Sequence, residues 1–232
     1  MSKTIIIVGF GPGVSTAVAE KFGAAGFSVA LIARSQSRLA AGVEALKAKG
    51  VAAAGFPADA GDPAAIRGAI AKARSELGPI AVLHWNASTG RGLGDLMVVE
   101  PISMKNAFDV AIVGLLSAVQ EALPDLKQAA DGAVLVTNGA YGDLNPVVDA
   151  FAITRNTEGV ALANAAKGKL VGLLAARLKA EGVFVGEVTI AAVVRAGIER
   201  DIPGIPMIDG EVVADAFWRL YKSRGDVRAR IG

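Results

Sequence analysis

Short runs of apolar, mostly β-branched residues alternate along the chain with longer stretches in which apolar residues recur at helical spacing. The runs predict strands at 5–8, 28–33, 51–56, 80–84, 133–137 and 183–190. The stretches between them predict helices at 14–25, 36–49, 62–76, 102–129, 157–181 and 209–223. Unbroken apolar runs are typical of strands buried on both faces. The alternation therefore predicts an α/β fold, a doubly wound parallel sheet with helices on both faces.

The carboxyl ends of parallel strands meet at one edge of a sheet, which is where such folds bind ligands. Two segments that follow strands at this edge, 141–156 and 194–208, contain prolines and lack a clear period. We predict that they are lid or substrate loops, although surface loops without a ligand are an equal alternative. A chain of 232 residues, 53% of them hydrophobic, is typical of one domain, so we expect a single domain over 1–232.

The first apolar run leads into a glycine-rich turn that contains Gly9, Gly11, Gly13, Val14 and Ser15. Glycines there let the backbone approach a pyrophosphate, and the N-terminus of the next helix presents free N–H groups to it. The pattern G-x-G-x-x-G is incomplete, because Val14 stands at its third glycine. The looser G-x-x-x-G-x-G fits Gly9 and Gly13, with Ser15 in the last position. A nucleotide site is predicted, and a turn without a ligand is the alternative.

The second predicted strand ends in Ala33-Arg34-Ser35, about 20 residues after the turn, where an NAD-binding protein places an acid on the ribose. No acid is present. Arg34, with Ser35 and Arg38, offers a fork of donors suited to a 2′-phosphate, which favours NADP(H) over NAD(H). A solvated arginine at the start of a surface helix is the alternative.

The composition removes several classes of function. The net charge is +2 and the basic residues are scattered, so we expect no nucleic-acid or membrane partner. With no cysteine and a single histidine, the chain has no disulfide and is predicted to bind no metal. A strand begins within the first residues, and no uninterrupted apolar run reaches the ~18 residues of a membrane span. We therefore expect a soluble cytoplasmic protein.

Four motifs, in order, resemble the short-chain dehydrogenase/reductase family over nearly the whole chain. They are the glycine turn, the Arg34 strand end, Asp59-Ala60 after the third strand, which in the family contacts the adenine, and Asn86-Ala87-Ser88 after the fourth. The strand containing Thr189 resembles the one that ends beside the nicotinamide. The resemblance implies a Rossmann fold, an oxidoreductase acting on a small carbonyl or alcohol, and a homodimer or homotetramer built on the two long helices.

The predicted active site departs from the family pattern of an asparagine, a serine, and a tyrosine followed four residues later by a lysine. The asparagine position is Ala111 and the serine position is Gly139, and neither side chain can donate a hydrogen bond.

The tyrosine and lysine positions depend on the register of the long helix. If Lys167 is the family lysine, the tyrosine position is Ala163. Counting back without gaps from the end of the helix instead gives Asn164 and Val160. We favour the ungapped register, because deleting three residues would rotate the packed face of the helix. Neither register supplies a tyrosine.

Tyr141, Asn164 and Lys167 are therefore the candidate catalytic residues, with Tyr141 as a relocated proton donor or, alternatively, a loop residue. His84 lies within an apolar strand and is interpreted as a core histidine. The leading interpretation is an NADP(H)-binding oxidoreductase with a non-standard active site. A catalytically silent NADP(H)-binding sensor or partner subunit is the main alternative, and a non-redox enzyme on the same fold is a third.

Overall fold

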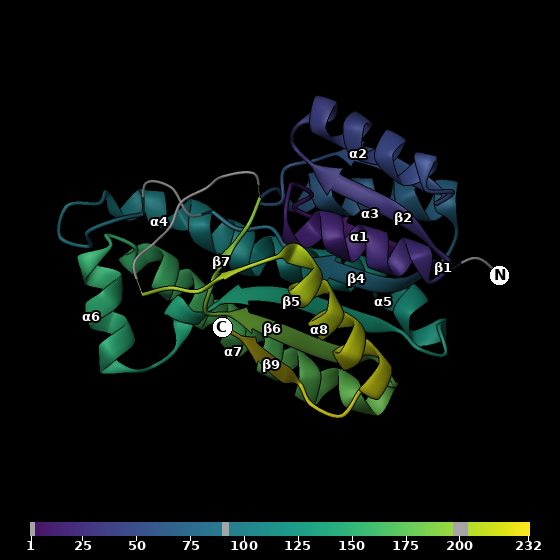
Figure 1. Ribbon diagram of the computed structural model, residues 1–232. Helices are drawn as coiled ribbons and strands as arrows, with labels where there is room; N and C mark the ends of the chain where they lie inside the picture. Colours follow the sequence, from purple (N-terminus) through teal and green to yellow (C-terminus); the bar gives the residue numbers. More distant parts are fainter. Residues whose placement is uncertain (1–2, 90–92, 197–203) are drawn as a thin grey trace.

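The structure is a computed structural model that describes residues 3–89, 93–196 and 204–232. Its centre is a parallel seven-stranded sheet with the order β3-β2-β1-β4-β5-β6-β9 (Figure 1). The strands are β1 Lys3–Val8, β2 Phe27–Ala33, β3 Ala53–Pro57, β4 Ile80–Trp85, β5 Ala133–Gly139, β6 Phe184–Ile190 and β9 Arg228–Ile231. The strand order reverses direction at β1, so the prediction of a doubly wound parallel sheet, the Rossmann fold, is confirmed.

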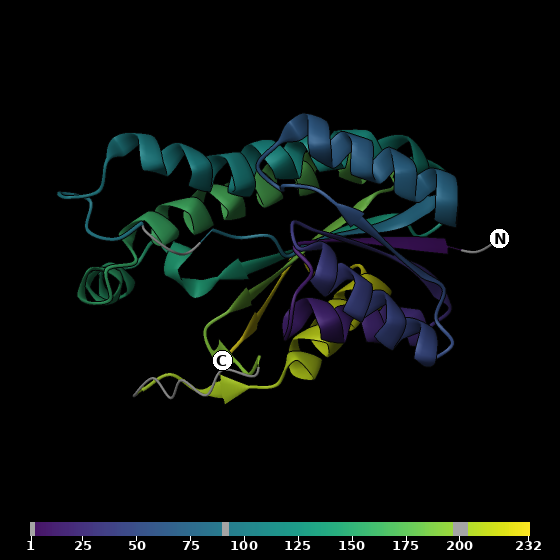
Figure 2. The same ribbon diagram turned by 90° about the horizontal axis from the view of Figure 1, so that it is seen from above.

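Helices cover both faces of the sheet, as Figure 2 shows in a view along its edge. One face carries α1 Val14–Ala24, α2 Gln36–Ala48 and α8 Gly210–Ser223. The other carries α3 Pro63–Leu77, α7 Glu158–Leu178, and a long helix made of α4 Pro101–Phe108, the π-helix η1 Asp109–Gly114 and α5 Leu115–Gln128. Each layer buries one apolar face of its helices against the sheet, which leaves the carboxyl ends of the strands free for a site.

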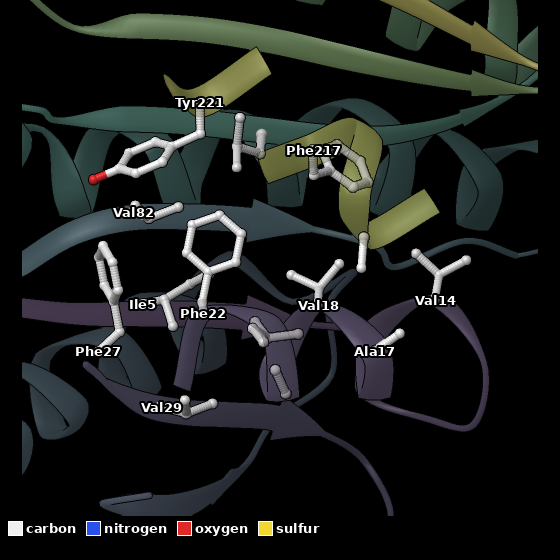
Figure 3. Close-up of a cluster of buried hydrophobic side chains, with 14 of the residues drawn as sticks. Ile5, Val14, Ala17, Val18, Phe22, Phe27, Val29, Val82, Phe217 and Tyr221 are labelled. Atoms are coloured by element: carbon white, nitrogen blue, oxygen red, sulfur yellow. The ribbon is translucent and has the colours of Figure 1, made fainter. Parts of the chain in front are cut away.

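Aromatic side chains hold the α1–α8 layer to the sheet (Figure 3). Phe22 of α1 is fully buried and meets Phe27 edge-on, with 5.4 Å between the ring centroids. Tyr221 of α8 lies 5.4 Å from the Phe22 ring, and its hydroxyl donates a 2.7 Å hydrogen bond to Asp131. Burying rings of this size stabilises the fold by roughly 1.5–3 kcal/mol each. This layer fixes the helix α1 that follows the glycine turn.

Several elements were not expected from the sequence. The segment 141–156 holds a short 3₁₀ helix, η2 Ala140–Gly142, and a full helix, α6 Pro146–Thr154. Asn145 caps α6 by accepting a 2.8 Å hydrogen bond from the Val147 amide, and Pro146 suits the first turn. This capping signal was present in the sequence but is local and short.

The last strand, β9, was missed because it is a four-residue edge strand in which exposed arginines alternate with half-buried apolar residues. The expected strand 51–56 begins instead at Ala53, because Val51 packs against Gly23 of α1 before the chain enters the sheet. In the segment 194–208, two short strands pair, β7 Val193–Val194 and β8 Met207–Ile208, and residues 197–203 lie outside the described part.

Two helical segments, Pro101–Gln128 and Glu158–Glu181, are long and apolar enough to cross a membrane by length and composition alone. Charged residues interrupt both segments, so the expectation that no uninterrupted apolar run reaches the length of a span is not contradicted, although the mean hydropathy of each segment is high. The reason is that a helix packed on a sheet carries a broad apolar face and few charges. Core helices of soluble proteins pass the same test, and both segments pack against the sheet, so this is weak evidence for a membrane span.

Candidate functional site

Among the clefts formed by the described residues, three open beyond the carboxyl ends of the strands. The large cleft, of about 1180 Å³, lies over β1, β2 and β4. The inner cleft, of about 360 Å³, adjoins it and shares Asn86–Thr89 and Ala107 with it. The outer cleft, of about 430 Å³, lies beside α6 and shares Tyr141 with the inner cleft. Ten of the predicted nucleotide-binding residues line the large cleft: Gly9, Gly11, Arg34, Ser35, Arg38, Asp59, Ala60, Asn86, Ala87 and Ser88.

Glycine is required at position 9 because the glycine turn lies directly against the backbone of the segment after β4. Its φ of +85° disfavours any residue with a side chain, and a Cβ would lie 2.5 Å from the Ala87 backbone. The turn and the segment after β4 are also joined by hydrogen bonds from Asn86, whose amide donates to Val8 O at 2.8 Å and whose Nδ2 donates to Gly9 O at 3.2 Å. The floor of the large cleft is therefore rigid.

Gly13, Val14, Ser15 and Thr189 are not among the residues that line the three clefts. A Cβ on Gly13 would meet Ala196 at 3.3 Å and not the large cleft, although its φ of +90° still favours glycine. Ser15 is fully buried and its Oγ accepts a 2.9 Å hydrogen bond from the Gly11 amide. It therefore shapes the turn from behind. A direct contact of these four residues with a nucleotide stays a prediction.

The rim of the large cleft at the end of β2 is positively charged. Arg34 and Arg38 are both exposed, and neither guanidinium pairs with an acid in the described part of the chain. Ser35 caps α2 by accepting a 3.3 Å hydrogen bond from the Arg38 amide, which fixes the backbone between the two arginines. Two guanidinium groups at the end of β2 that pair with no acid of the described chain can bind a phosphate.

The opposite wall of the large cleft comes from the long helix and was missed by sequence reasoning. Ser103, Asn106 and Asp109 line the cleft there. The π-helix begins at Asp109, and a Cβ on Gly114 would lie 1.9 Å from the Ala60 carbonyl oxygen, so only glycine lets the helix approach β3 this closely. A glycine inside a long helical pattern was the available signal.

The inner cleft contains every position considered for the family's catalytic asparagine, serine, tyrosine and lysine. Val160, Ala163, Asn164 and Lys167 all line it, so both helix registers turn their residues toward the same space. No tyrosine occupies any of these four positions. A Cβ at Gly139 would lie 2.6 Å from Asn164 Nδ2. The amide of Asn164 therefore fills the space that a side chain at position 139 would take.

Lys167 is 4% exposed, although its side chain reaches the inner cleft. Its ammonium group forms no hydrogen bond or ion pair with the residues that the structure describes. Burial lowers the pKa of Lys167 from 10.5 to about 8, against a weaker attraction by Glu187 that raises it. Lys169, two residues on, is exposed, so only one of the two lysines can act in the cleft.

Glu187, an acid in the middle of a buried strand, anchors the wall behind Lys167 and is 1% exposed. One oxygen accepts a 2.5 Å hydrogen bond from Asn138 Nδ2, and the other accepts one of 2.8 Å from Arg228 Nε. Asn138 also donates to the Asn164 carbonyl at 3.0 Å, which ties α7 to β5. Sequence reasoning missed Glu187, although a charge within an apolar strand was a visible signal.

Tyr141 and His84, the other titratable candidates, take different places. Tyr141 stacks on Phe151 of α6 with 5.8 Å between the ring centroids, and it forms the wall between the inner and outer clefts. His84 is fully buried, and its Nε2 lies 3.1 Å from Thr137 Oγ1. Burial lowers the pKa of His84 to about 3, so it is neutral at physiological pH and is a core residue.

This topology, with its glycine turn and clefts at the carboxyl edge, defines the doubly wound class of nucleotide-binding folds. The model of the short chain dehydrogenases matches residues 3–151, and the chain belongs to this family. A short chain dehydrogenase of Pseudocercospora fijiensis is 31% identical over 186 residues, which cover 78% of this chain and 57% of that relative. The chain thus spans little more than half the length of this curated relative.

Solved structures share the fold over the whole chain. The L-sorbose reductase of Gluconobacter frateurii, complexed with NADPH and L-sorbose, has a TM-score of 0.85 at 16% identity and covers all of this chain and 95% of its own. A short chain oxidoreductase of Pseudomonas aeruginosa, described as containing an atypical catalytic center, has a TM-score of 0.84 at 19% identity, over 99% of this chain and 95% of its own. At such identities the likeness concerns the fold.

Proposed function

We propose that this chain binds NADP(H) and interconverts a carbonyl compound and an alcohol, with Lys167 in place of the usual tyrosine as the group that exchanges a proton with the substrate oxygen. The observation that carries the proposal is a buried lysine, unpaired within the described residues, in an inner cleft that adjoins a larger cleft bordered by two arginines without an ion pair in the described chain.

Three features of the large cleft suit NADP(H), a dinucleotide with a 2′-phosphate. The first turn of α1 follows the glycine turn directly, and its backbone N–H groups have no acceptor within the helix. A Cβ on Gly11 would have only the Arg38 side chain near it, at 3.7 Å, so the backbone is open to the cleft there. Arg34 and Arg38 would hold the 2′-phosphate that distinguishes NADP(H) from NAD(H). The described part of the cleft has no acid at the end of β2 that would select NAD(H).

NADP(H), when bound, supplies or accepts the hydride. The chain's own residues have to orient the carbonyl and exchange a proton with its oxygen. The Lys167 ammonium holds a proton that it can donate, and a pKa of about 8 is close to the range in which a general acid works well near neutral pH. Asn164 Nδ2, in the space of the absent serine side chain, can donate a hydrogen bond to the same oxygen.

The family supports this assignment at the level of the fold and cofactor. L-sorbose reductase carries NADPH on the same fold, and the Pseudomonas aeruginosa oxidoreductase has a catalytic center described as atypical. A dimer or tetramer formed through the long helices, a cytoplasmic location and a small-molecule substrate belong to the same proposal.

Cofactor preference is tested by isothermal titration calorimetry with NADPH and NADH. We expect NADPH to bind at least tenfold tighter, about 1.4 kcal/mol. Arg34→Ala should remove most of this preference. Arg219→Ala, an exposed arginine on α8 outside the clefts, should leave it unchanged. Equal affinities would remove the role of Arg34, and no binding of either nucleotide would overturn the proposed function.

Catalysis is tested with a panel of ketones, aldehydes and alcohols followed by NADPH absorbance. Lys167→Met should reduce turnover by about 10²- to 10⁴-fold, the usual contribution of a general acid. If NADPH binds but no substrate turns over, the silent sensor or partner subunit is the better description. The absence of side-chain donors at Ala111 and Gly139 favours that second candidate.

A further inference from the structure

The ring of Tyr141 belongs to the walls of both the inner and the outer cleft, so the two hollows are neighbours on either side of one side chain. The ring is fixed from outside by stacking on Phe151 of α6. Gly142 holds the backbone beneath it, because a Cβ there would lie 2.6 Å from the Ala165 amide nitrogen of α7. Tyr141 is therefore the boundary that a molecule reaching from the inner into the outer cleft has to pass.

The outer cleft is lined largely by apolar side chains that nothing in the described structure covers. Met97, Leu144 and Ile153 are 88%, 96% and 59% exposed, and Leu96 and Leu162 are exposed as well. Large apolar side chains gathered at one place on a surface mark a binding site. Figures 1 and 2 show that α6, which supplies Ile153, projects at the end of the molecule where the carboxyl ends of the strands lie.

The charged residues of the outer cleft are all acidic. Asp95, Asp143, Asp149 and Glu158 line it, and no lysine or arginine does so among the described residues. Arg230 pairs with Asp143 at 2.6 Å and offsets one of these charges. The remaining carboxylates would repel a negatively charged group that entered the cleft. This charge pattern selects against fatty-acid carboxylates and phosphate-bearing carriers.

We propose that the outer cleft is the subsite for a neutral apolar tail of the substrate, whose carbonyl group lies beside Lys167 in the inner cleft. The proposal rests on the proposed function and names its substrate class: aliphatic ketones or aldehydes without an acidic group at the far end. Each methylene that passes Tyr141 buries apolar area against Leu144, Ile153 and Leu162. Because the cleft is open on one side, each should tighten binding by about two- to threefold, below the roughly fourfold of complete burial.

The test is calorimetric titration of 2-alkanones, from 2-pentanone to 2-decanone, into the chain saturated with NADP⁺, in which the ketone cannot be reduced. Affinity should rise with each carbon. Ile153→Asp should weaken 2-decanone by about tenfold and leave 2-pentanone unchanged. Val212→Asp is the control, because Val212 is also exposed, at 43%, but lies on α8 and outside the clefts. Circular dichroism confirms that both variants are folded.

The charge of the tail is tested with 9-oxodecanoate, which has the length of 2-decanone but ends in a carboxylate. It should bind at least tenfold more weakly than 2-decanone, and Asp149→Lys should reverse much of that difference. An affinity that does not change along the 2-alkanone series, or a series unaffected by Ile153→Asp, overturns the subsite. If NADPH does not bind either, the proposed function has failed with it.

A second copy of the chain is the competing occupant of the outer cleft. Sedimentation velocity of the parent and of Ile153→Asp distinguishes the two. An oligomer that the substitution dissociates would assign these apolar residues to a subunit interface and overturn the tail subsite. An unchanged sedimentation coefficient together with a lost chain-length dependence supports it.

Discussion

Replacing Lys167 with methionine should stabilise the fold while it reduces turnover. Lys167 is buried without a partner in the described structure, and burial lowers its pKa from 10.5 to about 8. A shift of one pKa unit corresponds to about 1.36 kcal/mol, so keeping the ammonium charged in the folded state costs about 3 kcal/mol. Methionine has a similar length and no charge, so Lys167→Met should be about 3 kcal/mol more stable at pH 7.

The pH dependence gives a sharper test of the same reasoning. Below pH 8 the folded and unfolded chains both carry the proton on Lys167, and the whole penalty applies. Between pH 8 and 10.5 the folded chain has lost this proton and the unfolded chain has kept it, so the stability of the parent rises with pH. The advantage of Lys167→Met should therefore vanish by about pH 10.5. Tyr221, whose pKa burial raises, affects both proteins equally and cancels.

The assay is urea unfolding, followed by circular dichroism at pH 7, 8, 9 and 10. Lys169→Met is the matched control, because Lys169 is exposed on the same helix, and it should change stability by less than about 0.5 kcal/mol at any pH. A constant difference between the parent and Lys167→Met over this range, or a less stable variant at pH 7, would refute a buried charged lysine. The catalytic role given to Lys167 would lose its electrostatic basis at the same time.

Three further predictions address the core and the site. Gly9→Ala should destabilise the fold by about 2–5 kcal/mol in urea unfolding, because it combines backbone strain with a Cβ that lies 2.5 Å from the Ala87 backbone. Gly26→Ala is the control: its φ of +92° is also strained, but a Cβ there meets no other atom. Between pH 6.5 and pH 5 the free energy of unfolding of the parent should fall by about 2 kcal/mol more than that of His84→Leu. The reason is that His84 takes up a proton in the unfolded chain but stays neutral in the folded chain, where its pKa is about 3. Equal pH dependence of stability in the two proteins would exclude this. Tyr141→Phe should keep turnover within about twofold, because the ring serves as a wall, and a loss as large as that of Lys167→Met would make Tyr141 the donor.

Much of the sheet could be predicted because its strands are buried on both faces and therefore read as unbroken apolar runs. The elements that escaped prediction are those with mixed surroundings. β9 is half exposed, and α6 lies at the surface, where hydrophobic periodicity is weak. The positions around Gly13 were predicted from a motif, but which way a Cβ points depends on tertiary contacts, here with the segment after β7.

The location of the candidate site could be predicted from the sequence, but the arrangement of its side chains could not. The strand ends located it, and Asn164 and Lys167 were both named because two registers could not be separated by counting residues. The fold shows why counting could not decide: positions four apart on α7 face the same cleft in either register. Glu187 was missed because its partners, Asn138 and Arg228, come from distant parts of the chain.

The residues around the inner cleft make most sense as a set of linked substitutions. A serine at Gly139 would collide with the Asn164 amide, so the loss of that side chain and the presence of an asparagine on α7 accommodate each other. Small residues at Ala111 and Ala163 leave a pocket of about 360 Å³ into which Lys167 reaches. A pocket kept only for packing would not retain a buried lysine whose pKa burial lowers and whose ammonium has no ion pair among the described residues. Unfavourable local features of this kind are expected at functional sites, and in the inner cleft that feature is the burial of Lys167 without an ion pair.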